Sequence, residues 1–244
     1  MKIVAVIPSR YGSSRFPGKP LATIAGKPMI RHVYERAKGC RELTDVYVAT
    51  DDQRIIRCVE EFGGKAIMTQ GVHPSGTDRV REAASVLGLE EGDLVVNIQG
   101  DQPAFNSSSI SLLLEPLLKD GTISMSTLMF HLENESHALD PNNVKVISDR
   151  DGFAIYFSRS PVPYYRDAVN RKVYYKHLGF YAFRMQFLSL FSALPQGVLE
   201  QAEKLEQLRA LEYGYRIKVI ESRWDSPEVD VPSDIKKIEH LILP

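Results

Sequence analysis

The chain has 244 residues, of which 43% are hydrophobic and 25% are charged. This composition can bury a core, which excludes wholesale disorder. The 30 Lys and Arg residues nearly balance the 31 Asp and Glu residues, and the formal charge of −1 argues against a dedicated nucleic-acid or anionic-membrane binder.

Membrane and secretory signals are not expected in this sequence. The apolar runs fall short of the ~20 residues that cross a bilayer, and the N-terminal residues do not follow the signal-peptide pattern. The two cysteines, Cys40 and Cys58, fit no metal-ligand spacing, which favours reduced thiols. We therefore expect a cytoplasmic protein without a membrane partner.

Short apolar runs alternate with segments of helical periodicity over roughly the first 120 residues. Strands are predicted at residues 3–7, 46–49, 65–68 and 94–98. Helices are predicted at residues 28–37, 53–62, 77–87 and 107–118. Four strand–helix units in succession predict a parallel, doubly wound sheet.

The pattern changes after about residue 120. Strands are predicted at residues 124–129, 144–147, 154–157, 174–183 and 217–220, and helices at 185–193, at 199–213 and from Ser233 onward. Consecutive strands with few helices between them favour antiparallel pairing. We therefore expect an α/β fold in a single domain over residues 1–244, with a mostly parallel sheet and a smaller antiparallel elaboration in the second half.

The loop after the first predicted strand carries the clearest chemical signal. Residues 8–20 bring Arg10, Arg15 and Lys19 together with two glycines and three serines. Glycines allow close backbone approach and the cations offset several negative charges, which is the combination that a polyphosphate needs. The loop is not a P-loop, because Pro20 stands where that motif needs Ser or Thr. A solvated basic loop is the structural alternative.

Carboxylates near the ends of other predicted strands could hold a metal ion. Asp101 follows the fourth predicted strand, next to Gly100. A carboxylate at this position could bind Mg²⁺, and the structural alternative is an aspartate that only forms a turn. Asp230 is a second carboxylate, which could also cap the last helix, and Asp225 is a weaker rival. Considered without any resemblance, residues 73–79 have the pattern of an ordinary helix start in which Ser75 is the capping residue.

Residues 7–27 resemble the nucleotidyltransferases that join a nucleoside triphosphate to a sugar. Within them the chain resembles the cytidylyltransferases that make CMP-activated acidic sugars, above all the family that acts on 3-deoxy-manno-octulosonate (Kdo), an eight-carbon acidic sugar. The similarity continues through residues 73–79, 97–103, 157–163, 176–181 and 228–235.

This resemblance implies a Rossmann-like domain of the nucleotide-diphospho-sugar transferase type. It implies a CTP-binding half at about residues 1–120 and a sugar-binding and dimerisation half at 121–244. The activity implied is transfer of CMP from CTP to Kdo for lipopolysaccharide biosynthesis, by a cytoplasmic homodimer with Mg²⁺ as cofactor.

The resemblance also assigns roles to individual residues. Catalytic roles fall to Arg10, Lys19, Asp101 and Asp230, and the two aspartates are the implied Mg²⁺ ligands. The implied CTP-binding residues are Ser9, Arg10, Gly12, Ser13, Arg15, Lys19, Ser75, Gly76, Thr77, Gln99 and Gly100. The implied sugar-binding residues are Arg79, Gln102, Arg159, His177, Tyr181, Glu206 and Gln207.

Several of the sugar-side residues have structural alternatives. Taken singly, His177 reads as a structural histidine, Tyr181 as a core aromatic residue, and Glu206 as a solvated charge on an amphipathic helix. Gln102 departs from the family form, which has Glu after the metal-binding aspartate. This departure leaves open an 8-amino analogue of Kdo as the substrate, while sialic acid fits the later motifs less well. An inactive nucleotide sensor is the alternative outside enzymes.

Overall fold

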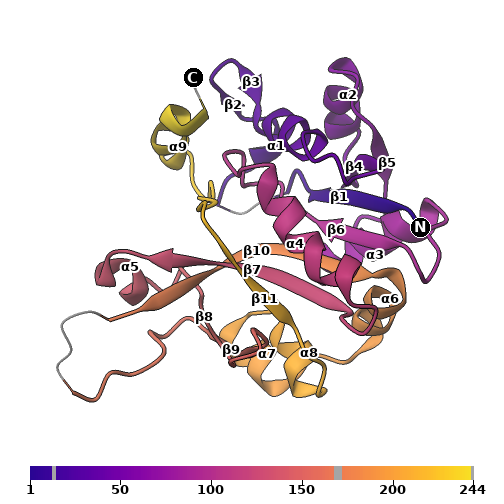
Figure 1. Cartoon of the computed structure of the whole chain (residues 1–244). Helices are drawn as coiled ribbons and strands as arrows, with labels where there is room; N and C mark the ends of the chain where they lie inside the picture. Colours follow the sequence, from indigo (N-terminus) through magenta and orange to yellow (C-terminus); the bar gives the residue numbers. More distant parts are fainter. Residues whose placement is uncertain (13–14, 168–171, 243–244) are drawn as a thin grey trace. The chain divides into compact units, whose positions relative to one another are not determined.

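The computed structural model describes residues 1–12, 15–167 and 172–242 (Figure 1). The chain forms two compact units. The first comprises Met1–Ser111, Phe183–Ser192 and Ser226–Pro244, and the second comprises Leu112–Ala182 and Ala193–Asp225. Asp230 therefore belongs to the same unit as the N-terminal loop, although it lies in the second half of the sequence.

Strand–helix alternation builds the first unit. Its elements are β1 (Ile3–Ser9), the 3₁₀ turn η1 (Lys19–Leu21), β2 (Thr23–Ile24), β3 (Lys27–Pro28), α1 (Met29–Lys38), β4 (Asp45–Thr50), α2 (Gln53–Glu61), β5 (Ala66–Met68), α3 (Gly76–Val86), β6 (Leu94–Asn97), most of α6 (Met185–Ala193) and α9 (Asp234–Ile242). All four strands predicted in the first half are present. The short β2–β3 hairpin was not predicted.

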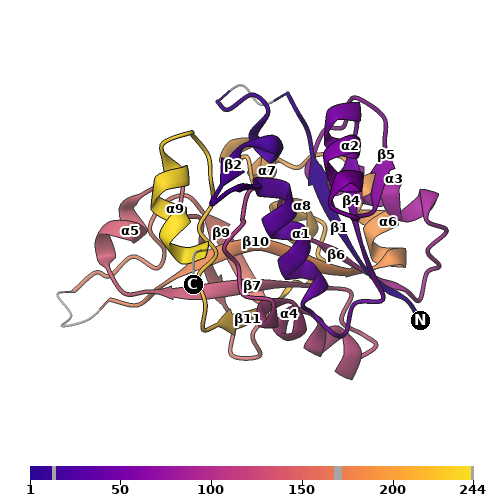
Figure 2. The same ribbon diagram turned by 90° about the horizontal axis from the view of Figure 1, so that it is seen from above.

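The strands of this unit run parallel in the order β6-β1-β4-β5. Because parallel crossovers are right-handed, the reversal of direction between β5 and β6 moves the connecting helix to the other face of the sheet. Figure 2 shows α1 and α3 on opposite sides of β1. The predicted doubly wound, mostly parallel sheet is confirmed.

Local sequence explains why these elements form. Residues Ile3–Ile7 of β1 are buried, as expected of a strand covered on both faces. Helix α2 begins after Asp52, whose side chain accepts a hydrogen bond from the backbone N–H of Arg54 at 2.9 Å. Its apolar residues Ile55 and Val59 are fully buried, so the helix packs against the rest of the unit through one apolar face.

The second unit is built mainly from strands. It contains β7 (Met125–Leu132), α5 (Glu135–Leu139), β8 (Lys145–Ser148), β9 (Ala154–Ser158), α7 (Val198–Glu203), α8 (Leu208–Glu212) and β11 (Lys218–Ser222), together with most of α4 (Ser108–Lys119) and of β10 (Tyr174–Arg184). Strand β11 is parallel to β7, whereas β8 is antiparallel to both β9 and β10. The predicted antiparallel elaboration is thus confirmed.

The single helix predicted at residues 199–213 is wrong. The chain forms α7 and α8 instead, because Lys204 takes a left-handed conformation with a φ of 55°. Its backbone N–H donates to the carbonyl of Glu200 at 2.8 Å, which ends α7. Glu206 and Gln207 consequently lie in the connection between two short helices.

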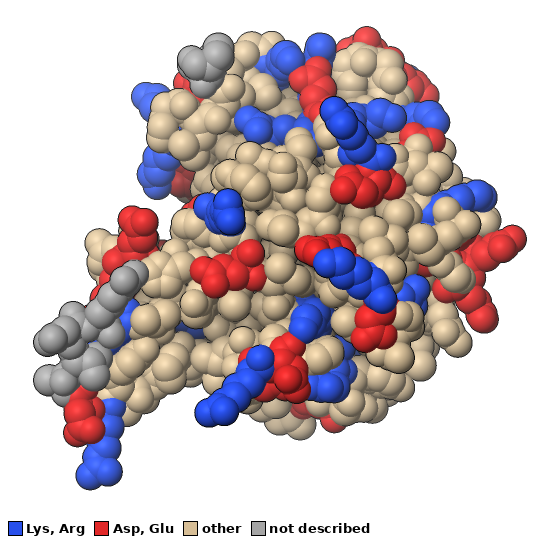
Figure 3. Space-filling view, in the orientation of Figure 1, with Lys and Arg blue, Asp and Glu red and all other residues tan. Residues whose placement is uncertain are grey.

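Charged side chains are distributed without a single dominant sign. On the face shown in Figure 3, basic and acidic residues are interspersed, in line with the formal charge of −1. None of the described helices combines the length and the apolar character that a bilayer crossing requires.

A buried ion pair joins the two short helices of the second unit. The guanidinium of Arg209 donates to both carboxylate oxygens of Glu200, at 2.7 and 2.6 Å, and both residues are buried. Breaking such a pair leaves an uncompensated buried charge.

Replacement of Glu200 by Leu is therefore expected to lower the free energy of unfolding by about 3 kcal/mol. Urea denaturation followed by circular dichroism measures this change. Gln201→Leu, an exposed position on the same helix, is the matched control and should change stability little. An equal effect of the two substitutions would contradict a role for the ion pair.

Candidate functional site

A cavity of about 490 Å³ lies in the first unit beyond the carboxyl ends of β1 and β6. Ligands of open parallel sheets bind at this edge. Among its lining residues are these predicted site residues: Ser9, Arg10, Arg15, Lys19, Ser75, Gly76, Arg79, Gln99, Gly100, Asp101 and Asp230. The segments that sequence analysis singled out separately thus meet at one cavity.

Opposite charges are concentrated in this cavity. The Nζ of Lys19 lies 2.6 Å from Oδ2 of Asp101 and 4.0 Å from Oδ1 of Asp230. The guanidinium of Arg15 contacts both carboxylate oxygens of Asp230, at 3.0 and 3.1 Å. Two aspartates that are remote in the sequence are therefore brought within reach of one ammonium group.

Backbone and core contacts fix the position of Asp230. Its neighbour Val229 is fully buried in a cluster with Ile24, Met29 and Ile238. The Val229 N–H donates to the carbonyl of Asp101 at 2.9 Å, and the Val229 carbonyl accepts from Nζ of Lys19 at 3.0 Å. Together these contacts hold the segment before α9 against the turn that carries Asp101.

Asp230 does not cap the last helix. The carboxylate of Asp234 accepts hydrogen bonds from the backbone N–H groups of Asp230 and Val231, both at 3.1 Å. Asp234 thereby holds the segment before α9 in place, and its position in the first turn of the helix is favoured for an acidic residue. The Asp230 side chain is left to interact with the cations of the cavity.

The loop between β1 and η1 is shaped by Gly18 and Tyr11. Gly18 has a φ of 70°, a conformation that favours glycine, and its N–H donates to the Tyr11 carbonyl at 2.9 Å. The Arg54 guanidinium lies 3.3 Å from the centre of the Tyr11 ring, a cation–π contact. Gly12 does not line the cavity, and Ser13 lies outside the described residues.

Gly100 allows the turn after β6 to lie against β1. A Cβ at this position would come within 2.8 Å of the Ser9 hydroxyl and 3.1 Å of the Pro8 carbonyl oxygen. Ser9 is buried, and its hydroxyl has no hydrogen-bond partner among the described residues. An unsatisfied buried hydroxyl at the cavity wall is consistent with a bound polar ligand.

The start of α3 combines a helix cap with a cavity wall. Ser75 and Asp78 form a capping box, with the Ser75 hydroxyl accepting from the Asp78 N–H at 3.2 Å. Arg79 is buried and donates to Thr69 Oγ1 at 2.6 Å. Thr77 does not line the cavity; it is buried and accepts from Asn97 at 3.1 Å.

Sequence reasoning missed some of the cavity wall. His73 received no functional role, yet it lines the cavity with its Nε2 2.6 Å from a Glu82 carboxylate oxygen. Val229 contributes a carbonyl to Lys19 that no side-chain motif encodes. The resemblance over residues 73–79 and the position of His73 between β5 and α3, at the ligand-binding edge of a parallel sheet, were the signals that could have indicated it.

In the second unit, His177 and Tyr181 lie close together in the core. Both are buried, and their ring centres are 5.5 Å apart. The Nε2 of His177 lies 2.8 Å from the Thr127 hydroxyl. Burial, with a smaller contribution from the charge of Lys176, lowers the pKa of His177 from 6.5 to about 3. The histidine is therefore neutral at physiological pH.

Arg159 and Gln207 are also held within the second unit. Arg159 donates from Nε to the Glu203 carbonyl at 2.7 Å and from Nη1 to the Pro141 carbonyl at 2.9 Å. The Glu203 carboxylate, which sequence reasoning missed, accepts from the Arg159 N–H at 2.9 Å. Gln207 is buried, and its Nε2 has no hydrogen-bond partner among the described residues.

The carboxylates of the cavity fit a magnesium ion better than a metal held entirely by protein. No group of three or more His, Cys, Asp or Glu side chains in the described part of the chain could hold a metal ion. Mg²⁺ is commonly bound by one or two carboxylates, with water and substrate phosphates completing its shell. Asp101 and Asp230 provide this donor set.

Comparisons with known proteins identify the family of the chain. A model of the cytidylyltransferase family matches residues 4–220. The 3-deoxy-manno-octulosonate cytidylyltransferase of Desulfatibacillum aliphaticivorans is 55% identical over 242 residues, which are 99% of each chain. The 8-amino-3,8-dideoxy-manno-octulosonate cytidylyltransferase of Shewanella baltica is 53% identical over 243 residues, also 99% of each chain.

Solved structures show the same fold. A CMP:2-keto-3-deoxy-manno-octonic acid synthetase complexed with CTP has a TM-score of 0.93 and 44% identity, covering 99% of this chain and 98% of that one. A 4-diphosphocytidyl-2C-methyl-D-erythritol synthase has a TM-score of 0.67 over 99% of both chains. At 14% identity, the second likeness concerns the fold alone.

Replacement of Gly100 by Ala is expected to lower the free energy of unfolding by about 1–3 kcal/mol, because the added Cβ is too close to β1. Chemical denaturation measures the effect. Gly92→Ala, where an added Cβ meets nothing within 4 Å, is the control. Unchanged stability of the Gly100 variant would show that β1 and the turn can separate at little cost.

Acid is expected to destabilise the chain through His177. Its pKa is lower in the folded state, about 3 against 6.5, so the unfolded chain binds the extra proton. Stability is therefore lost as pH falls from 6.5 toward 3, by up to about 1.4 kcal/mol per pH unit. Unfolding free energies at several pH values should show a shallower loss in His177→Gln and an unaltered one in the exposed control His137→Gln. Equal slopes in all three proteins would contradict this assignment.

Proposed function

Because the chain belongs to the cytidylyltransferase family, we propose that it transfers CMP from CTP to the anomeric hydroxyl of Kdo and releases pyrophosphate. The observation that carries this proposal is the meeting of Asp101 and Asp230 with Lys19 and Arg15 in one cavity. Relatives named for this reaction, similar along 99% of the chain, support it.

The basic side chains of the cavity would bind the triphosphate of CTP. Arg10, Arg15 and Lys19 all line the cavity, and guanidinium groups suit phosphate oxygens because they donate in a fork. Neutralisation of the β- and γ-phosphates also favours departure of pyrophosphate, since negative charge develops there in the transition state. The same cations therefore serve binding and leaving-group stabilisation.

The two aspartates would hold Mg²⁺ beside the α-phosphate. There the ion supplies charge neutralisation and lowers the pKa of the attacking hydroxyl. Asp101 is fixed by its contact with Val229, and Asp230 by the burial of Val229 in the core. The chain thus holds both carboxylates rigidly, which favours in-line attack of the sugar hydroxyl on phosphorus.

Small residues border the part of the cavity that remains for the nucleoside. Ser75 and Gly76 at the start of α3 line it, together with Ser9. We propose that the cytosine and ribose lie against these residues, while Gln99 and Gly100 face the phosphates. The sugar-binding roles of Arg159, His177, Tyr181, Glu206 and Gln207 stay predictions, as do the homodimer and the cytoplasmic location.

Replacement of Asp101 by Asn is expected to lower turnover by about three orders of magnitude, because a neutral amide is a poor magnesium ligand. Pyrophosphate release from CTP and Kdo measures this, and circular dichroism checks the fold. Glu61→Gln, an exposed position on α2, is the control. Near-normal turnover of the Asp101 variant would overturn the metal assignment. Tight CTP binding by the unaltered protein without turnover would favour a nucleotide sensor instead.

A further inference from the structure

The loop between β5 and α3 lacks the support of the sheet. Residues 70–73 form no backbone–backbone hydrogen bond with any residue that the structure describes. Gly71 and Val72 are exposed, and the side chain of Val72 lies almost entirely in solvent. The position of this loop therefore depends on contacts with side chains.

Glu82 on α3 contacts the loop at two points. Both of its carboxylate oxygens accept from the backbone N–H of Gln70, at 3.0 and 3.1 Å. Its Oε2 also lies 2.6 Å from Nε2 of His73, an electrostatic contact without the alignment of a hydrogen bond. One carboxylate thus holds the residues on either side of Gly71 and Val72.

Arg79, one turn earlier on the same helix, holds the beginning of the loop. Its Nη1 donates to Oγ1 of Thr69 at 2.6 Å and to the carbonyl of Gln70 at 3.3 Å. Residues three positions apart on a helix share a face, so Arg79 and Glu82 act on the loop together. The contact of Glu82 with His73 extends this hold to the far end of the loop.

The segment that Glu82 holds is a wall of the cavity. Residues 71–76 all line it, whereas Glu82 itself does not. The proposed function places the cytosine and ribose at the end of this wall, against Ser75 and Gly76. The cations proposed to bind the triphosphate belong to a different loop, which follows β1. The contacts of Glu82 therefore concern the nucleoside and not the phosphates.

We propose that Glu82 is a positioning residue for the nucleoside of CTP. It fixes residues 70–73 before the ligand arrives, and it strengthens CTP binding without touching CTP. A loop that is already fixed loses less conformational entropy when its ligand binds. This inference rests on the proposed function, because that function places the nucleoside at this wall.

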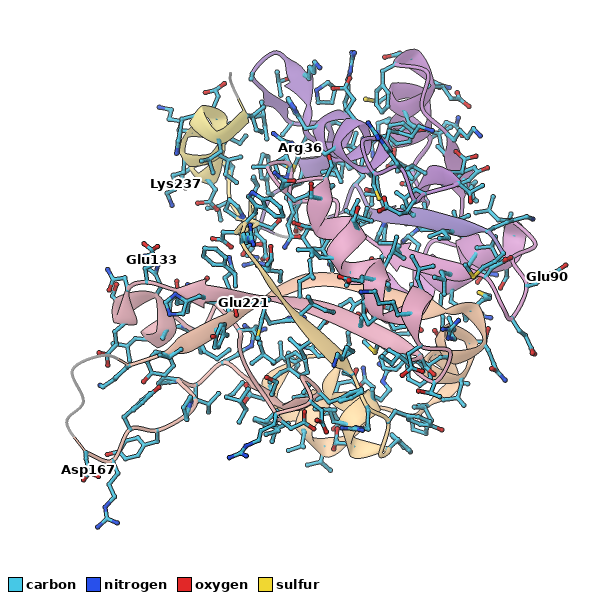
Figure 4. All side chains as sticks on the ribbon, in the orientation of Figure 1. Arg36, Glu90, Glu133, Asp167, Glu221 and Lys237 are labelled. Atoms are coloured by element: carbon cyan, nitrogen blue, oxygen red, sulfur yellow. The ribbon has the colours of Figure 1, made fainter. Side chains whose placement is uncertain are left out.

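Two ligands separate the nucleoside wall from the cations. CTP contacts both, whereas inorganic tripolyphosphate has no nucleoside and depends on the cations alone. Isothermal titration calorimetry with each ligand, at one fixed magnesium concentration, gives dissociation constants that do not depend on the fraction of folded protein. Glu82→Ala removes the carboxylate and introduces a good helix former. Glu90→Ala removes an exposed carboxylate from the same unit and serves as control; Figure 4 labels Glu90.

We expect Glu82→Ala to bind CTP about 10-fold more weakly and to bind tripolyphosphate with unchanged affinity. Glu90→Ala should bind both ligands like the unaltered protein. A merely structural role of Glu82 would weaken both ligands, so equal losses overturn the inference, and so does unaltered CTP binding. If the unaltered protein binds CTP but releases no pyrophosphate with Kdo, the proposed activity is overturned and the role of Glu82 stands. Failure of the unaltered protein to bind CTP overturns both.

Discussion

The attraction between Lys19 and the two aspartates is the interaction on which the geometry of the candidate site depends. Carboxylates at close range repel one another, and two of them at the edge of a sheet need cations nearby. Lys19 supplies one positive charge to both, and Arg15 supplies a second to Asp230. A triphosphate requires the same cations and a magnesium ion requires the same carboxylates, so the charges that stabilise the site are those that its chemistry would use.

The parallel sheet makes this gathering possible with short connections. Strands β1 and β6 are neighbours and run in the same direction, so the basic loop and the Asp101 turn leave the sheet at one edge. Asp230 reaches that edge differently. Its segment is anchored by the buried Val229 and by α9, where Ile238 packs in the same cluster and Glu239 accepts a hydrogen bond from the Ala25 N–H at 3.0 Å.

Local patterns in the sequence were sufficient for the sheet and for most of the cavity. The buried strands appear in the sequence as apolar runs. The loops after these runs contain the charged residues that meet at the cavity in the structure. Contacts between side chains that are far apart in the sequence could not be predicted from any local pattern. The Gln102–Glu228 hydrogen bond joins residues 126 positions apart, and neither residue alone indicates its partner. The break at Lys204 was missed because its left-handed conformation is not typical of lysine.

The order of the segments in the chain has a consequence for synthesis in the cell. The strands β1, β4, β5 and β6 and the basic loop after β1 leave the ribosome early, while Asp230 and the buried Val229 belong to the same unit but emerge more than a hundred residues later. Nascent chains fold from the N-terminus as they appear. The partly made protein can therefore build these strands before the second aspartate of the pair has been synthesised.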